Sequence, residues 1–286
     1  MPISYRAMTH DDVTRVNEVW KAAIMPQMIS RDQPSRSRSN REEEAALARF
    51  HHLVSTDPKG VFVATDNTEI IGICQSLRRG GIFVLSRLGI APDHQEQGIG
   101  RELLSLALAY ADESDEQYIF TSLDPRAIHT YVREGFTLNP CVRLWGHNGD
   151  SDLPASIRTG NRSDLDLIDA IDQKQRGVSR RKDLELWLQF ESRVLIDDEG
   201  GYLLFDDNRL ISLCAQSIQI ADRLLSTALR GALGNMPLEA AWIVKEQQWA
   251  ITAAMRSRAT IEVHGAMLTK NVRDFVVPYL PNASLG

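Results

Sequence analysis

Residues 85–104 read LSRLGIAPDHQEQGIGRELL, and this stretch decides the fold. An apolar strand is expected to end at Ile90, and an amphipathic helix to begin beside Gly98 and Gly100. Glycines let successive backbone N–H groups point into one concavity with no Cβ in the way. Because a helix N-terminus adds unpaired donors and a positive partial charge, the stretch predicts a site for an anion such as a pyrophosphate.

Two other glycine-rich phosphate sites do not fit this stretch. The dinucleotide-binding fingerprint needs three glycines directly after a strand, whereas here two follow a seven-residue lead-in. A Walker loop is excluded because no Gly-Lys-Ser/Thr follows. An ordinary glycine-containing loop before a helix stays open as the structural alternative.

The neighbouring patterns predict alternating helices and strands around this stretch. The segment 30–40 is polar and without period, hence a loop, and residues 147–154 form the best linker of the chain. Apolar periodicity and turn residues predict strands at 3–7, 61–64, 70–74, 82–90, 118–123 and 137–145, and helices at about 10–23, with Thr9 as the N-cap, 42–53, 98–112 and 126–133.

After the linker the pattern begins again, which indicates two diverged copies of one α+β unit. Ile70–Cys74 aligns with Leu210–Cys214, since each follows a strand and an Asp-Asn turn. The second copy is expected to be shorter, with no room for a long strand between Gln216 and Ala221 and with no glycine-rich turn. The alignment also places Ala253 and Ser257 opposite Tyr131 and Gly135.

Composition bounds the class of protein. The chain has 286 residues, 32 Lys and Arg, 38 Asp and Glu and a formal charge of −6, which disfavours a nucleic-acid binder. Its three cysteines are too few and scattered for a disulfide framework or a four-cysteine zinc site, so no metal is expected. No apolar run could span a bilayer and no signal peptide is visible, which predicts a cytoplasmic protein.

The motif Gln95-x-x-Gly98-x-Gly100 resembles motif A of the GNAT superfamily, the acetyl-CoA-dependent N-acetyltransferases. Downstream, residues 124–136 resemble motif B of that family, in which a helix carries a tyrosine, here Tyr131, shortly before Gly-Phe. The expected order of elements over residues 3–145 is also similar to that fold.

The resemblance implies an α+β protein with two tandem GNAT-like domains, each a mostly antiparallel central sheet flanked by helices. The expected domains are an acetyl-CoA-binding domain at 1–147 and a degenerate copy at 154–286. The implied activity is direct acetyl transfer to an amine of a small molecule or peptide, with catalysis in the first copy. A homodimer is compatible with this reading.

The resemblance also assigns site residues. Tyr131 would act as the general acid for the leaving thiolate, and Asp124 stands where the family often has asparagine near the pantetheine or ribose. The backbone of Leu88, Gly89 and Ile90 would pair with the pantetheine arm, with the Ile90 N–H as the candidate to polarise the thioester carbonyl. The residues implied around the pyrophosphate are Gln95, Gln97, Gly98, Ile99, Gly100 and Arg101.

Some points stay open at this level. The strand 82–90 carries no carboxylate to serve as general base. A water chain, His129 or a substrate that arrives as the free base could replace it, and the histidines at 51, 52 and 94 are further candidates. A non-catalytic acyl-CoA-binding or ligand-sensing module is the rival reading, and an amino-acid-linked thiol cofactor precursor is a further acceptor. In the second copy, Trp242, Trp249, Leu213 and Ile251 are expected in the core, and the tail 275–281 is expected to pack across a neighbouring surface.

Overall fold

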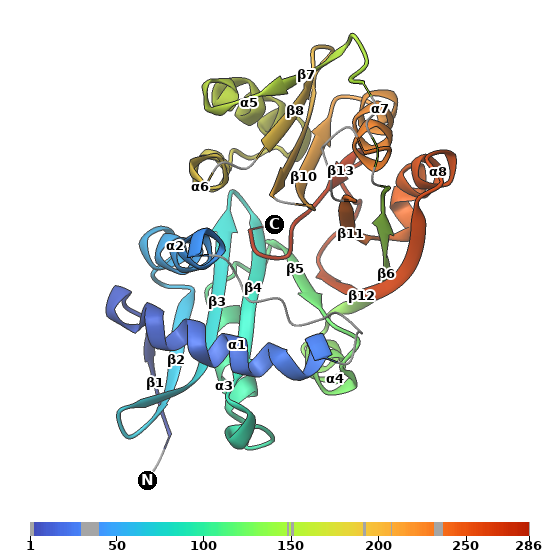
Figure 1. The fold of residues 1–286 in the computed structure, drawn as a ribbon. Coiled ribbons are helices and arrows are strands. Elements are labelled where there is room, and N and C mark those ends of the chain that lie inside the picture. Colours follow the sequence, from blue (N-terminus) through green and yellow to red (C-terminus); the bar gives the residue numbers. More distant parts are fainter. Residues whose placement is uncertain are drawn as a thin grey trace. The chain divides into compact units, whose positions relative to one another are not determined.

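The computed structural model of the chain describes residues 3–29, 40–147, 149, 152–190, 193–206, 208–231 and 237–285. Contacts divide the chain into two compact units, residues 1–119 together with Leu285, and residues 120–284. Each unit combines helices with a largely antiparallel set of strands (Figure 1). The predicted α+β class is therefore confirmed. Of the predicted loop 30–40, all but Asn40 lies outside the described residues.

The first unit has five strands in the order β1-β2-β3-β4-β5, antiparallel except for the parallel pair β4–β5. Strand β5 begins in this unit and ends in the second. The elements are β1 (Ser4–Ala7), α1 (Val13–Ile29), α2 (Asn40–Thr56), β2 (Val61–Asp66), β3 (Glu69–Arg79), β4 (Ile82–Ile90), α3 (Ile99–Leu108) and β5 (Glu116–Thr121). These bounds confirm the elements predicted for this part of the chain.

Helices cover both faces of these strands. A Cβ at Gly89 would meet the Trp20 ring of α1 at 3.1 Å, whereas one at Gly72 would meet Leu103 of α3 at 3.1 Å. The two helices therefore lie on opposite faces, each close enough to need glycine beneath it. The predicted apolar faces close the core, with Val13 and Val16 of α1 and Leu103 of α3 buried to 1% exposure or less.

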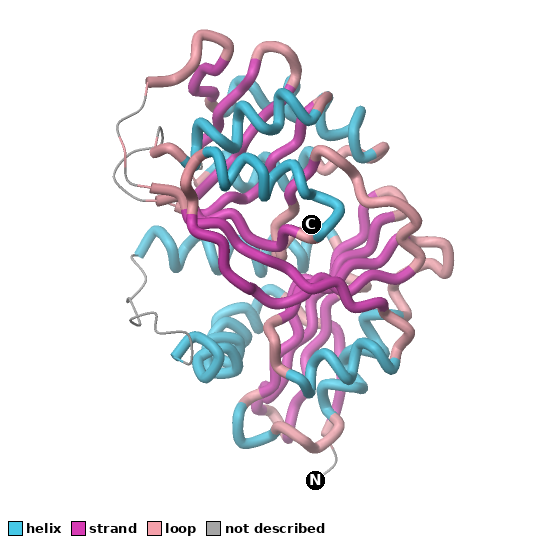
Figure 2. Tube along the Cα trace, turned by 90° about the vertical axis from the view of Figure 1, so that its right-hand side faces the viewer, coloured by secondary structure: helices cyan, strands magenta, loops and turns pink. Residues whose placement is uncertain are grey.

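The second unit has the strand order β12-β6-β11-β10-β9-β8-β7, and a short strand β13 pairs with β10 off this path. Helices again lie on both sides of the strands (Figure 2). The elements are α4 (Pro125–Arg133), β6 (Thr137–Trp145), β7 (Ile157–Gly160), α5 (Leu165–Arg176), α6 (Arg181–Gln189), β8 (Arg193–Asp197), β9 (Gly201–Asp206), β10 (Arg209–Ala215), α7 (Ile218–Leu229), β11 (Glu239–Ile243), α8 (Gln248–Arg256), β12 (Thr260–Lys270) and β13 (Tyr279–Leu280).

The series from β7 to β12 repeats the series from β1 to β6 element by element. β10 pairs antiparallel with β9 and parallel with β11, as β4 does with β3 and β5. The expectation that no long strand fits between Gln216 and Ala221 is confirmed, because α7 begins at Ile218, and the second half still has its full series of strands because Arg193–Asp197 forms β8. The alignment of Leu210–Cys214 with Ile70–Cys74 is off by one strand, because similar Asp-Asn turns occur in different hairpins of the two halves.

The second compact unit contains strands from both predicted copies. β6, the last strand of the first copy, lies between β12 and β11 and is antiparallel to both. The contacts of β6 therefore join it to the second half of the chain, and the compact units separate at residues 119 and 120. The sequence division into 1–147 and 154–286 stays a prediction.

A buried carboxylate connects three elements of the first unit. Asp57, directly after α2, is fully buried and accepts hydrogen bonds from the Arg79 guanidinium at 2.8 and 2.9 Å. The Tyr110 hydroxyl, just beyond α3, donates to it at 3.1 Å, and the Arg78 N–H of β3 donates at 2.9 Å. Asp57 thus fixes the end of α2 against β3 and the chain after α3.

Replacing Asp57 with alanine is expected to lower the free energy of unfolding by about 3–5 kcal/mol, because it leaves the Arg79 charge without its buried partner. Urea unfolding followed by circular dichroism measures this change. The control is Asp112→Ala, which removes a carboxylate that is 61% exposed and bonds Arg78, and which should cost about 0–1 kcal/mol. Equal losses in the two variants would contradict the role given to Asp57.

Candidate acyl-CoA cradle and its counterpart

Strand β4 changes its hydrogen-bond partners half-way along. Its first residues pair with β5 in parallel, and the last such pair is Leu85 opposite Ile119. A bulge at Ser86 then shifts its register against β3. Beyond the bulge, residues 88–90 pair with β3 and with no second strand in the part of the chain that the structure describes. The predicted residues Leu88, Gly89 and Ile90 therefore present one backbone edge to a ligand.

The loop after β4 carries two residues in the left-handed region, Glu96 at φ +64° and Gly98 at φ +83°. Gly98 is the N-cap of α3, and its carbonyl accepts from the N–H groups of Arg101 and Glu102 at 3.0 and 3.2 Å. The N–H groups of residues 98–100 have no acceptor among the described residues. These donors are free among the described residues at the start of α3, and left-handed residues at 96 and 98 favour a backbone nest of the kind that binds anions.

The glycines leave this concavity open. A Cβ at Gly98 would meet nothing within 4 Å, and one at Gly100 would meet only Ile90, at 3.7 Å. Gly98 is required for its positive φ, because a side chain there strains the backbone. At Gly100 a side chain would make only an ordinary contact with the protein, so packing does not require the glycine. A glycine there keeps the first turn of α3 accessible to a ligand.

The side chains around the concavity hold the loop and add one charge. The Gln95 amide donates to the Ile90 carbonyl at 3.2 Å, which ties the loop to the end of β4. The exposed Gln97 amide donates to the Asp93 carbonyl at 3.4 Å. Arg101 is exposed in the first turn of α3, with no ion pair or hydrogen bond to the described residues. Free N–H groups, a helix N-terminus and this cation together fit a pyrophosphate.

The predicted Tyr131 lies on α4, in the second unit. α4 begins at Asp124, whose carboxylate caps it by accepting from the Arg126 N–H at 2.9 Å. Gly135, at φ +87°, ends the turn, and the Phe136 N–H donates to the Tyr131 carbonyl at 3.3 Å. Tyr131 is 6% exposed. Gly135 and Phe136 of the motif thus end α4 within one turn of Tyr131.

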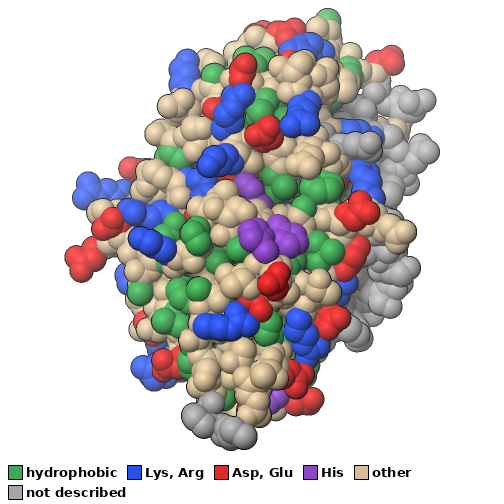
Figure 3. All heavy atoms as spheres, turned by 90° about the vertical axis from the view of Figure 1, so that its left-hand side faces the viewer, with side chains coloured by type: hydrophobic (Ala, Val, Ile, Leu, Met, Phe, Trp, Pro, Cys, Tyr) green, Lys and Arg blue, Asp and Glu red, His purple; other side chains and the backbone are tan. Residues whose placement is uncertain are grey.

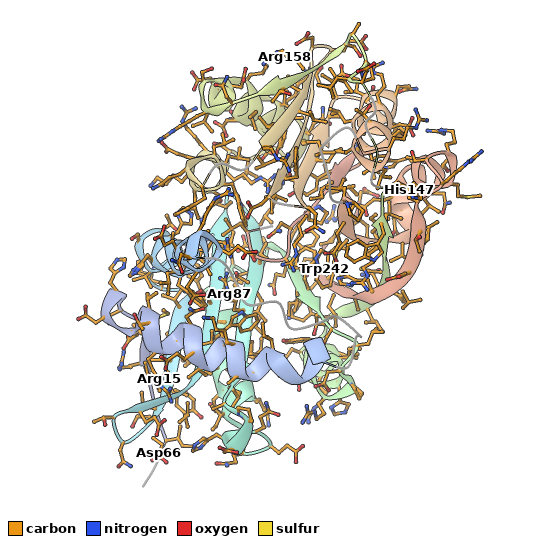
Figure 4. The ribbon with its side chains drawn as sticks, in the orientation of Figure 1. Arg15, Asp66, Arg87, His147, Arg158 and Trp242 are labelled. Atoms are coloured by element: carbon orange, nitrogen blue, oxygen red, sulfur yellow. The ribbon has the colours of Figure 1, made fainter. Side chains whose placement is uncertain are left out.

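Sequence reasoning missed Arg87, which Figure 4 labels on β4. It is 6% exposed and donates to the Gln75 side-chain oxygen at 3.1 Å, and its guanidinium lies 4.4 Å from the centre of the Phe50 ring. Gln75 in turn donates to the Phe50 carbonyl at 3.3 Å. A charged residue inside the apolar run 82–90 was the available signal. Arg87 is a buried cation two residues before Gly89, on the same face of β4.

The histidines named as candidate bases do not gather at β4. His51 of α2 stacks on His10 at 5.1 Å between ring centres, with 2.8 Å between their Nδ1 atoms. Burial, with the neighbouring His10 as a second cause, lowers the pKa of His51. Histidine side chains meet on the face shown in Figure 3, among charges of both signs. His94 is half-buried after β4 and His129 is exposed on α4, so the general base stays open.

The equivalent place in the second unit is built differently. Only two residues, Gln216 and Ser217, separate β10 from α7, and the Ser217 hydroxyl caps the helix by accepting from the Ile220 N–H at 3.3 Å. β10 pairs with β11 at one position alone, Arg209 opposite Glu239. β13 of the tail then pairs antiparallel with β10, which confirms that the tail packs on a neighbouring surface.

The core predicted for the second copy is confirmed in part. Leu213 is fully buried, Trp249 is 8% exposed, and Ile251 packs on the core. Trp242 instead is half-buried at φ +63°, in a bulge of β11. Its ring meets Phe120 and His264 edge-on, with centres 5.4 and 4.6 Å away.

No group of three or more His, Cys, Asp and Glu side chains in the described residues could hold a metal ion. No described helix is both long and apolar enough to cross a membrane.

Comparison with known proteins identifies the fold. Residues 57–138 match the family model of the acetyltransferase (GNAT) domain. A crystal structure of a protein assigned as an acetyltransferase from Pyrococcus horikoshii has a TM-score of 0.79 at 18% identity, over 99% of this chain and 96% of the other. No curated protein matches the sequence.

Two further solved structures are similar over nearly the whole chain. A GCN5-related N-acetyltransferase from Sphaerobacter thermophilus gives a TM-score of 0.60 at 14% identity, over 99% of this chain and 98% of the other. A tandem GNAT protein from the clavulanic acid biosynthesis pathway gives 0.58 at 14% identity, over 94% and 98%. Residues 57–138 therefore match the acetyltransferase (GNAT) domain, and the chain as a whole has the fold of a tandem GNAT protein.

Proposed function

We propose that this protein is an acetyl-CoA-dependent N-acetyltransferase that moves the acetyl group directly to an amine of a small molecule or peptide. The observation that carries the proposal is the donor set at residues 98–100, which has no acceptor among the described residues and follows the one-sided edge of β4 after the loop 91–97. The Gln95 amide ties this loop back to the Ile90 carbonyl, so one extended ligand with a diphosphate at one end can satisfy both features.

In this proposal the residues 95–101 hold the pyrophosphate of acetyl-CoA, with Arg101 as the added cation. The backbone of Leu88, Gly89 and Ile90 accepts the amides of the pantetheine arm as a further strand would. Bound there, acetyl-CoA supplies an activated acetyl thioester. Asp124 acts by capping α4, and its contact with the ribose or pantetheine stays a prediction.

The chain's own residues then have three tasks. The Ile90 N–H donates to the thioester carbonyl oxygen and stabilises the charge that grows on it when the amine attacks. The Tyr131 hydroxyl gives its proton to the leaving sulfur as the C–S bond breaks and the C–N bond forms. The proton lost by the amine passes to a base that the described residues do not single out.

We place catalysis in the first half and regard the second half as a degenerate copy. The turn between β10 and α7 is too short for a nest, and the helix N-terminus there is capped by Ser217. β13 pairs with β10 along the backbone edge that corresponds to the unpaired edge of β4, so this edge is not available to a ligand. The helix position corresponding to Tyr131 is Ala254 and not the expected Ala253, because the Ala259 N–H donates to the Ala254 carbonyl as the Phe136 N–H does to the Tyr131 carbonyl.

A non-catalytic acyl-CoA-binding module is the second candidate. One observation favours it, namely that the buried polar side chain on β4 beside the open edge is the cation Arg87 and not a carboxylate that could accept a proton. Both candidates use the acyl-CoA cradle, which consists of the backbone edge at residues 88–90 and the loop and helix start at residues 95–101. They differ in whether Tyr131 is needed.

Replacing Tyr131 with phenylalanine is expected to lower the turnover number by about 100-fold or more, because the leaving sulfur loses its proton donor. The Kd for acetyl-CoA should change by less than about threefold, since the pyrophosphate carries the affinity. Thiol release with an acceptor found by screening measures turnover, and calorimetry measures the Kd. Tyr5→Phe on the edge strand β1 is the control. Unchanged turnover in the Tyr131 variant would remove it from the mechanism, and saturable binding without thiol release from any amine would favour the module.

The variant Gly100→Asp separates stability from binding. An acid in the first turn of α3 stabilises the helix, so the free energy of unfolding should stay the same or rise by about 0.3–1 kcal/mol. The same charge repels the pyrophosphate, and the Kd for acetyl-CoA should rise by about tenfold or more. Ser105→Asp adds the same charge further along the exposed side of α3 and should leave the Kd within about threefold. A Gly100→Asp protein that binds as tightly as the wild type would place the cofactor elsewhere.

A further inference from the structure

A tryptophan lies on the open part of β4 and has no part in the proposed reaction. α1 crosses β3 and β4 on one face of these strands (Figure 1). A Cβ at Gly89 would meet Cε3 and Cζ3 of the Trp20 ring at 3.1 and 3.5 Å, and the Ala23 Cβ at 3.2 Å. The benzene half of the indole therefore lies against the backbone of Gly89, where a side chain would displace it.

The Trp20 ring is not sealed in the core. Val16 and Val19 on the same helix are 0 and 2% exposed, whereas Trp20 is half-buried. Part of a large aromatic surface thus stays accessible beside residues 88–90. A tryptophan seated on a glycine in this way has a well-defined position, because the strand beneath it carries no side chain that could move.

One edge of β4 is bonded at this point and the other is open. The Ala91 N–H donates to the Ile71 carbonyl of β3 at 2.8 Å, so the polar groups of Ala91 point towards β3. Because these directions alternate along a strand, the groups of Gly89 point the same way and those of Ile90 point to the open edge. The Gln95 amide takes the Ile90 carbonyl at 3.2 Å. The Ile90 N–H is therefore the outward donor next to Gly89.

Two apolar side chains flank the open edge, one on each face of β4. Ile90 lies on the face of α3, since a Cβ at Gly100 would meet its Cγ1 at 3.7 Å. Trp20 lies on the face of α1, against Gly89. Both side chains are half-buried. A group held at the Ile90 N–H thus lies beside apolar surface on both faces of the strand.

We propose that Trp20 limits the size of the acyl group that the cradle accepts. This inference rests on the proposed function, in which the Ile90 N–H donates to the thioester carbonyl oxygen. The acyl carbons then continue from the open edge, alongside the indole. An acetyl group ends after one methyl group, whereas a longer chain meets the Trp20 ring and binds less well. Trp20 is a specificity-determining residue and takes no part in the proton transfers.

The test is isothermal titration of CoA, acetyl-CoA and butyryl-CoA into the full chain and into Trp20→Ala. The wild type should bind acetyl-CoA about tenfold or more tightly than butyryl-CoA, because two further methylenes meet the indole. Trp20→Ala should lose most of this difference. Its Kd for CoA, which has no acyl group, should stay within about threefold of the wild type, since the pyrophosphate carries the affinity.

The matched control is Val19→Ala, which removes a buried side chain of the same helix that does not contact Gly89. It should lower the free energy of unfolding but leave the ratio of the two acyl-CoA Kd values within about threefold of the wild type. Trp20→Phe keeps a ring and loses the pyrrole half. It should reduce the ratio by about threefold or more, and it decides the question if Trp20→Ala does not fold.

Two outcomes would overturn the role of Trp20. They are equal binding of acetyl-CoA and butyryl-CoA by the wild type, and a ratio of their Kd values that stays unchanged in the folded Trp20 variants. A wild type that binds none of the three ligands contradicts the cradle itself, so failure of the proposed function is distinguished from failure of this inference.

Discussion

The structure depends on one requirement, that the backbone N–H and C=O groups of a strand find partners on both sides. β4 and β10 occupy equivalent places in the two halves, and each leaves its parallel neighbour after a bulge, at Ser86 and Ile211. The groups freed in this way are satisfied differently. In the second half β13 of the same chain pairs with β10, whereas in the first half residues 88–90 have no second strand among the described residues. This difference is the physical basis for placing a ligand in the first half.

The same requirement explains why the compact units do not follow the sequence repeat. β6 ends the first copy, yet it pairs with β11 and β12 over most of its length. Its exposed residues carry no signal for a partner more than 90 residues away. Sequence patterns fix local structure well, because turn residues and apolar periodicity act over a few positions. Strand pairing between distant segments depends on which strand edges remain unpaired after local folding. No single segment of the sequence shows which edges these are.

The candidate site shows the same division. Gln95, Gly98 and Gly100 could be predicted because each has a local backbone role, in the loop anchor, the positive φ and the open first turn. Arg87 was missed, since its neighbours in the chain are apolar and its partners come from β3 and α2.

The central claim is that the chain has one acyl-CoA site, at the cradle between β4 and α3. Isothermal titration of acetyl-CoA into the full chain tests it most directly. We expect saturable binding with a stoichiometry of one per chain. Two sites per chain would mean that β13 does not close the second half, and the absence of binding at millimolar acetyl-CoA would contradict the assignment of the cradle.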